Sequence, residues 1–132
     1  MSNLNEELLS WLWKAENDFL NIENNLSSER VPWDTVCFHA QQAAEKLLKT
    51  AILARGIRPP RTHDLLVLLT ICSEGDPSLS VLVEECRMLT SFAVEIRYPH
   101  PSYEPNEEEA MDLVEAARGI REMIHLKLGF QA

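Results

Sequence analysis

Apolar residues recur every three or four positions along most of the chain, the spacing that places side chains on one face of an α-helix. The first such stripe consists of Leu4, Leu8, Leu12, Ala15, Phe19, Ile22 and Leu26. Residues off this stripe include Glu6, Glu7, Lys14, Glu16, Asn17 and Glu23, which are expected to face solvent. The pattern therefore predicts one long amphipathic helix over residues 4–26.

A second helix is predicted from about Trp33 to Arg55, after Pro32 and before Gly56, a residue type that often ends helices. Its apolar positions are Val36, Phe38, Ala40, Ala43, Ala44, Leu47, Leu48, Ala51 and Ile52. They occupy more than half of the helix circumference. A helix with so wide an apolar face contacts neighbours on two sides, so we expect it at the centre of the fold.

A shorter pattern follows the loop 56–62, which two prolines keep out of a helix. Residues 65–72 are apolar on all sides and predict a short helix. Either Thr62 or Asp64 is placed to cap it, because both side chains accept hydrogen bonds from backbone amides. The cluster 73–77 predicts a turn after this helix.

The last two helices flank a proline-containing segment. The first of them is predicted from a stripe formed by Leu79, Leu82, Cys86, Leu89, Ala93 and Ile96. Three prolines within residues 98–105 then forbid a helix. Asn106 is expected to cap the final helix, with acidic residues at 107–109 in its first turn and Gly129 at its end. The core face of this helix consists of Ala110, Leu113, Ala117, Ile120 and Ile124.

Four long helices and one short one, joined by brief connections, predict an all-α, up-and-down helical bundle. The chain has 132 residues, of which 45% are apolar and 25% charged, typical of one globular domain, so we assign residues 1–132 to a single domain. No apolar run approaches the ~20 residues needed to cross a bilayer, and the first residues lack the pattern of a signal peptide. We therefore expect a cytoplasmic protein without membrane contact.

The three cysteines, Cys37, Cys72 and Cys86, are too widely spaced for a zinc site, and each has apolar neighbours. We expect three buried thiols. The sequence also contains neither a Gly-rich phosphate loop nor an H-E-x-x-H motif, so we expect no metal and no other cofactor.

The formal net charge of −9 argues against a protein that coats DNA with its whole surface. One segment differs. Residues 46–63 include Lys46, Lys49, Arg55, Arg58 and Arg61 and no acidic residue. Because Arg and Lys bind phosphate oxygens through charge-assisted hydrogen bonds, this segment is a candidate phosphate-binding patch, with His63 at its end. The alternative is that the lysines pair with acidic residues elsewhere and the arginines are simply solvated.

A second candidate is the segment 97–103, Arg-Tyr-Pro-His-Pro-Ser-Tyr, which begins where a predicted helix ends. Arg97 is suited to stabilise charge on a phosphoryl group, and His100 to act as an acid or base. Tyr103 is a weaker candidate, as a hydrogen-bond donor, because a phenol with a pKa of about 10 is a poor base at neutral pH. The alternative is a surface loop whose tyrosines pack as partial hydrophobes.

A polar ridge lies on the otherwise apolar second helix. His39, Gln42, Lys46 and Lys49 follow one another at steps of three and four, so they share one side. This ridge is either the floor of a groove or an ordinary outward face. His125, on the last helix, is expected to face solvent.

Taken together, these residues resemble the HEPN domain, whose name stands for higher eukaryotes and prokaryotes nucleotide-binding. The matching segments, in chain order, are Trp13-x-Ala15-x-x-Asp18-Phe19, the run Cys-Phe-His-Ala-Gln-Gln-Ala-Ala-Glu-Lys-Leu-Leu-Lys at 37–49, Arg61-Thr62-His63-Asp64-Leu65, Arg97-Tyr98-Pro99 and Glu109-Ala110. They extend over almost the whole chain. The run 41–49 together with Arg97–Pro99 is the most specific part of the match.

The resemblance implies a bundle of about five helices, usually a homodimer, and two classes of function. Many HEPN proteins are encoded beside a minimal nucleotidyltransferase and form a toxin–antitoxin-like pair with it. Others are metal-independent endoribonucleases, in which an Arg and a His four to six positions later come from each subunit and meet at the dimer interface. Here Arg97 is followed by His100, only three positions on, which departs from the nuclease spacing.

We therefore expect first a dimeric module that binds the phosphate of a nucleotide or RNA and pairs with a nucleotidyltransferase. Arg97 would be the main phosphate ligand and His100 an orienting or acid–base group. Further phosphate contacts are assigned to Lys46, Lys49, Arg61, His39, Gln42 and His63. The alternatives are an Arg97/His100 ribonuclease and a non-catalytic helical scaffold.

Overall fold

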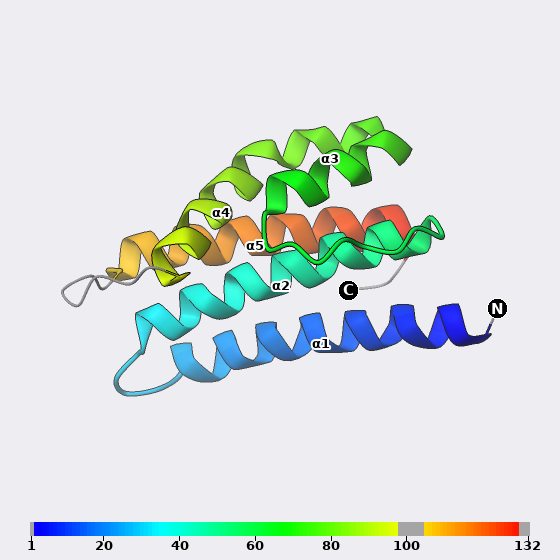
Figure 1. The fold of residues 1–132 in the computed structure, drawn as a ribbon. Coiled ribbons are helices and arrows are strands. Elements are labelled where there is room, and N and C mark those ends of the chain that lie inside the picture. Colours follow the sequence, from blue (N-terminus) through cyan, green and yellow to red (C-terminus); the bar gives the residue numbers. More distant parts are fainter. Residues whose placement is uncertain (1, 98–104, 130–132) are drawn as a thin grey trace.

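Two long antiparallel helices, α1 (Ser2–Leu26) and α2 (Trp33–Ala54), run side by side along one edge of the molecule (Figure 1). The structure is a computed structural model that describes residues 2–97 and 105–129, and the side chains of 5–92 and 105–129. The stripe predicted for the first helix is the face of α1 that packs on α2: Leu12, Ala15, Phe19 and Ile22 are buried. The first predicted helix is therefore confirmed.

The central position of α2 is confirmed as well, because it packs against α1, α3, α4 and α5. Its buried residues include Val36, Ala43, Leu47 and Ile52, which lie on more than one side of the helix. Phe38 was counted in the apolar set but is 39% exposed. Neighbouring helices cover most of the circumference of α2, but they leave this position near its start open.

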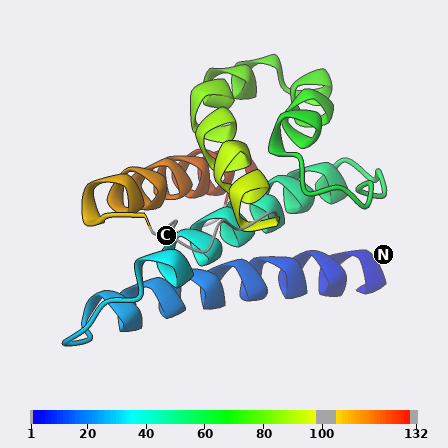
Figure 2. The same cartoon turned by 60° about the vertical axis from the view of Figure 1, so that its left-hand side comes forward.

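The rest of the described chain forms α3 (Leu65–Gly75), the 3-10 helix η1 (Pro77–Leu82), α4 (Val83–Arg97) and α5 (Glu107–Leu128). The α3 and α4 helices rise steeply from the other helices, and α5 runs in the same direction as α2 (Figures 1 and 2). The described residues thus form an all-α bundle of five α-helices with no strand, as predicted. None of these helices combines the length and the apolar composition that crossing a membrane requires.

The ends of the helices follow from local hydrogen bonds. The carboxylate of Asp64, and not the hydroxyl of Thr62, caps α3 by accepting hydrogen bonds from the amides of Leu66 and Val67. At α5, the Asn106 side chain and Glu109 form the predicted reciprocal capping box. Gly129 ends that helix with φ of +78°, in the left-handed region where a residue without Cβ is favoured.

The turn predicted over 73–77 is wrong in its position. Helix α3 continues through Gly75, and the turn is instead made by Asp76, which accepts a hydrogen bond from the Ser78 amide as η1 begins. Gly75 lies against Arg55: a Cβ at this position would come within 2.2 Å of Arg55 Nε. The Arg55 side chain thus lies directly against the backbone at Gly75.

The three cysteines are confirmed as buried thiols, because Cys37, Cys72 and Cys86 are at most 1% exposed. Burial raises the pKa of each to about 12. By contrast, the solvent-facing position expected for His125 is wrong. This histidine is 9% exposed, and its Nε2 lies 3.6 Å from Glu16 Oε1 on α1.

Candidate functional site

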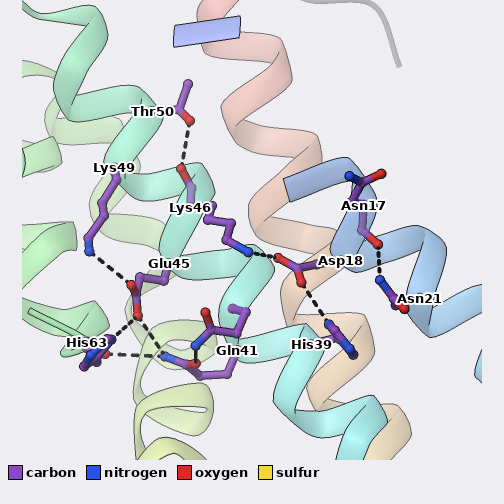
Figure 3. A network of polar contacts seen from close by, with 11 residues as sticks. Asn17, Asp18, Asn21, His39, Gln41, Glu45, Lys46, Lys49, Thr50 and His63 are labelled. Atoms are coloured by element: carbon purple, nitrogen blue, oxygen red, sulfur yellow. Dashed lines mark hydrogen bonds and ion pairs between the residues drawn. The ribbon is translucent and has the colours of Figure 1, made fainter. Parts of the chain in front are cut away.

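Asp18 of α1 lies at the centre of the first polar cluster. One carboxylate oxygen is 2.8 Å from His39 Nδ1 and the other is 2.6 Å from Lys46 Nζ, both on α2. The Asp18 side chain is only 7% exposed, whereas those of His39 and Lys46 are 20% and 22% exposed. This cluster therefore links α1 to α2, and within it the negative charge of Asp18 neutralises the positive charge of Lys46 (Figure 3).

Glu45 of α2 lies at the centre of the second cluster. Its Oε2 is 3.0 Å from Lys49 Nζ, and its Oε1 is 2.8 Å from Nδ1 of His63, in the loop before α3. The amide of Gln41 lies 3.5 Å from both Glu45 Oε1 and the His63 carbonyl oxygen. The side chains of Glu45 and Lys49 are 8% and 10% exposed, but that of His63 is 58% exposed. The cluster is thus buried at one end and open to solvent at His63.

The polar residues predicted to form one ridge on α2 do not form a single surface. Figure 3 shows His39 and Lys46 directed toward Asp18, and Lys49 directed toward Glu45 on another side of the helix. Gln42 donates a hydrogen bond to the side-chain oxygen of its neighbour Gln41. The packing of α1 and of the 55–64 loop on α2 divides the ridge into two carboxylate-centred clusters.

The arginines of the loop 55–64 differ in whether they have hydrogen-bond or ion-pair partners within the described residues. Arg55 donates to the Ile71 carbonyl oxygen of α3 at 2.6 Å. Arg58 pairs with Glu7 of α1, and this contact lowers the pKa of the carboxyl and raises that of the guanidinium. Arg61 is exposed, and it forms no ion pair or hydrogen bond with the part of the chain that the structure describes. Arg61 is therefore the arginine of this loop that is available to a ligand.

Trp11 of α1 lies beside the second cluster. The Lys49 ammonium is 5.9 Å from the centre of the Trp11 ring, within the range of a cation–π contact. The Trp11 side chain also contributes to the lowered pKa of Glu7, whose main cause is Arg58. The N-terminal half of α1 is thus joined to Lys49 and to the Arg58 end of the loop.

The second candidate segment lies largely outside the described residues. Arg97 is the last residue of α4, but its side chain is not described, and His100 and Tyr103 lie outside the described range. The prediction that Arg97 and His100 bind the same phosphate ligand as residues of the 46–63 segment stays a prediction.

Sequence reasoning missed the two carboxylates that organise these clusters. A signal for each was present. Asp18 lies beside Phe19 in the apolar stripe of α1, and Glu45 lies between Ala44 and Leu47 on the central helix α2. An acidic residue on a buried face requires a partner, so both positions indicated a charged neighbour on another element.

These residues lie within a segment that matches a known protein family. The HEPN domain model matches residues 8–127, which include both carboxylate clusters and Arg97. The chain belongs to the HEPN domain family. Neither the curated proteins nor the solved structures include one that matches it.

Within the described part of this HEPN domain, one of the pockets differs chemically from the 55–64 loop. It lies between α4 and α5, has a volume of about 330 Å³ and is lined by Met88, Ser91, Phe92, Pro105, Glu109, Asp112 and Leu113. Its charged groups are carboxylates, which repel phosphate. Of the sites described here, the exposed end of the Glu45 cluster suits an anionic ligand better.

Proposed function

We propose that this HEPN domain binds the phosphate of a nucleotide or RNA at Arg61 and His63. The observation that carries the proposal is that these two side chains are exposed two residues apart, at the open end of a buried network. Lys46, Lys49 and Arg58 have carboxylate partners, and Arg55 is bound to a backbone carbonyl. Arg61 and His63 therefore supply the ligand contacts, and Lys49 supports His63 through their shared partner Glu45.

Arg97 remains part of this proposal as a second phosphate ligand, together with His100, three positions later in the sequence. The support is its position at the end of α4, within the span that matches the family. A nucleic acid that contacts both Arg61 and Arg97 would make several charge-assisted hydrogen bonds, each stronger than a neutral one.

The test is a titration of nucleotides and a short RNA into the purified protein at two salt concentrations. Phosphate binding should weaken as salt rises and should fall about tenfold in Arg61→Ala, the loss expected for one charge-assisted hydrogen bond. Arg87→Ala is the matched control, because it removes the same charge from an exposed pair with Glu84 on α4. Binding that is indifferent to salt and equal in both variants would refute the proposal.

We also propose that the protein is a homodimer. Support comes from α1, whose outer face exposes Leu9 (57%), Trp13 (68%) and Leu20 (56%). These residues are four and seven positions apart and so form one stripe. Exposed apolar stripes of this kind are typical of protein interfaces. Sedimentation at micromolar concentration should give the dimer mass, and Trp13→Glu should shift it to the monomer; a wild-type monomer contradicts this part.

Pairing with a minimal nucleotidyltransferase completes the proposal, and its support is family membership. The direct test is to co-express the gene for this chain with a neighbouring nucleotidyltransferase gene. The proteins are then purified through a tag on one of them. Recovery of both at a fixed ratio supports the pair. Recovery of the tagged protein alone contradicts it.

A further inference from the structure

We propose that the Arg61–His63 pair is a receptor for a terminal phosphate, the dianion of a phosphomonoester, and that Glu45 is its positioning residue. This inference rests on the proposed phosphate-binding function and specifies its ligand. The ligand class includes mononucleotides and RNA ends that carry a phosphate, as distinct from internal phosphodiesters.

The orientation of the His63 ring follows from the Glu45 contact. An ionised carboxylate only accepts hydrogen bonds, so Nδ1 of His63, 2.8 Å from Glu45 Oε1, carries the hydrogen and donates it. The other ring nitrogen, Nε2, is on the opposite side of the imidazole. The His63 side chain is 58% exposed, whereas that of Glu45 is buried. Nε2 is therefore the ring nitrogen that is available to a ligand. When protonated, it is a directed N–H donor.

The groups around this ring leave Arg61 and His63 as its cationic side. Lys49 matches the charge of Glu45 at 3.0 Å, so a protonated His63 is not neutralised by the carboxylate that holds it. Arg61 adds a positive charge, and Asp64, whose carboxylate accepts hydrogen bonds from the Leu66 and Val67 amides at the start of α3, adds a negative one. On the α1 side, Arg58 and Glu7 form a pair and cancel. The formal surplus is one, and the N–H donors of Arg61 and of a protonated His63 suit a phosphate with several free oxygens, as in a phosphomonoester.

The same arrangement is poorly suited to a continuous nucleic-acid backbone. Binding along a backbone needs cations in a row, each facing a singly charged phosphodiester. In this loop Arg55 donates to the Ile71 carbonyl oxygen and Arg58 pairs with Glu7, which leaves one exposed guanidinium and one exposed imidazole, two positions apart in the sequence. Two donors, rather than a row of cations, suit one phosphate with several free oxygens, which is what a terminal phosphate offers.

The Asp18 cluster supplies an internal control. His39 is held through Nδ1 by a carboxylate that also binds a lysine, as in the Glu45 cluster. Its side chain, however, is only 20% exposed, and no exposed arginine lies two residues before it in the sequence. His39, for which the sequence predicted a phosphate contact, is instead held by Asp18 and lies outside the proposed receptor. His39→Asn therefore removes a carboxylate-held histidine of the same kind as a control.

The experiment compares one short RNA with and without a 5′-phosphate, titrated into the full chain at pH 6.5. We expect the phosphorylated RNA to bind about tenfold more tightly, the effect of one charge-assisted contact. His63→Asn should abolish this preference, and His39→Asn should retain it.

Glu45→Gln tests the positioning role. The amide keeps an acceptor oxygen but no charge, so we expect the preference for the phosphorylated RNA to fall while the affinity for the unphosphorylated RNA is kept, with thermal melting used to verify the fold. If both RNAs bind equally well and salt weakens both, the terminal-phosphate inference is wrong while phosphate binding stands. If neither RNA binds, both proposals fail.

Discussion

Nδ1 of His63 lies 2.8 Å from Oε1 of Glu45, although the two residues are 18 positions apart and on different elements. The carboxylate is almost buried on α2, and the imidazole lies on a loop and is mostly exposed. The buried carboxylate of Glu45 therefore orients the exposed imidazole of His63. This contact joins the central helix to the loop that carries the exposed Arg61 of this HEPN domain.

The Asp18 cluster should be important for stability. Asp18→Asn leaves Lys46 without its charged partner in a partly buried position and weakens the bond to His39. We expect the free energy of unfolding to fall by about 1–3 kcal/mol, the usual cost of leaving such a group unsatisfied. Urea unfolding followed by circular dichroism measures it. Glu84→Ala, which removes an exposed carboxylate from its pair with Arg87, should change stability by no more than about 0.5 kcal/mol; equal losses in the two variants would contradict this role.

His125 should make the protein less stable in mild acid. Burial lowers the pKa of this histidine below 6.5, Arg121 also lowers it, and Glu16 opposes the shift. The unfolded chain therefore binds a proton more readily than the folded one, and stability is lost as pH falls below about 6.5. His125→Gln, which does not titrate, should flatten the decrease between pH 7 and pH 5. Identical pH profiles for the wild type and His125→Gln would show that burial of this imidazole has no such effect.

The cysteines should be unreactive in the folded protein. Because burial raises the pKa of Cys37, Cys72 and Cys86 to about 12, almost no thiolate is present at pH 8. We expect a thiol reagent at pH 8 to modify none of the three at appreciable rate until denaturant is added, when all three react. Mass spectrometry of the folded and unfolded protein counts the modified thiols, and rapid labelling of any one in the folded state would contradict its burial.

The free protein should bind RNA without cleaving it. The support is the Arg97–His100 spacing of three, which is shorter than the four to six of the nuclease members described above. Incubation of RNA with the protein in a chelator, followed by gel electrophoresis, should show intact RNA. Cleavage that is lost in Arg97→Ala and retained in Arg87→Ala would instead favour the ribonuclease alternative.

The elements of this fold could be read from the sequence because they depend on local spacing. The stripe from Leu12 to Ile22 and the capping box at Asn106 and Glu109 involve residues within a few turns of one another. Helix periodicity and end caps act over the same short range. The error at 73–77 has the same cause: Gly75 is typical of a turn in its local sequence, but it lies within α3, beside the side chain of Arg55 from the loop after α2.

The candidate site was predictable only in part. The types and approximate positions of its cations, from Lys46 to His63, were evident in the sequence. Which of them are engaged depends on partners far along the chain: Asp18 for Lys46 and Glu7 for Arg58. The burial of His125 likewise depends on α1 passing beside α5, where Glu16 meets Arg121.

The sequence by itself determined the helices, their caps and the buried thiols, because the spacing of apolar residues decides which face of a helix leaves water. Only the tertiary structure decided which charges remain open to a ligand. A charged side chain on one helix can be neutralised by any element that packs beside it, and that choice follows from how whole helices cross, which no local pattern encodes.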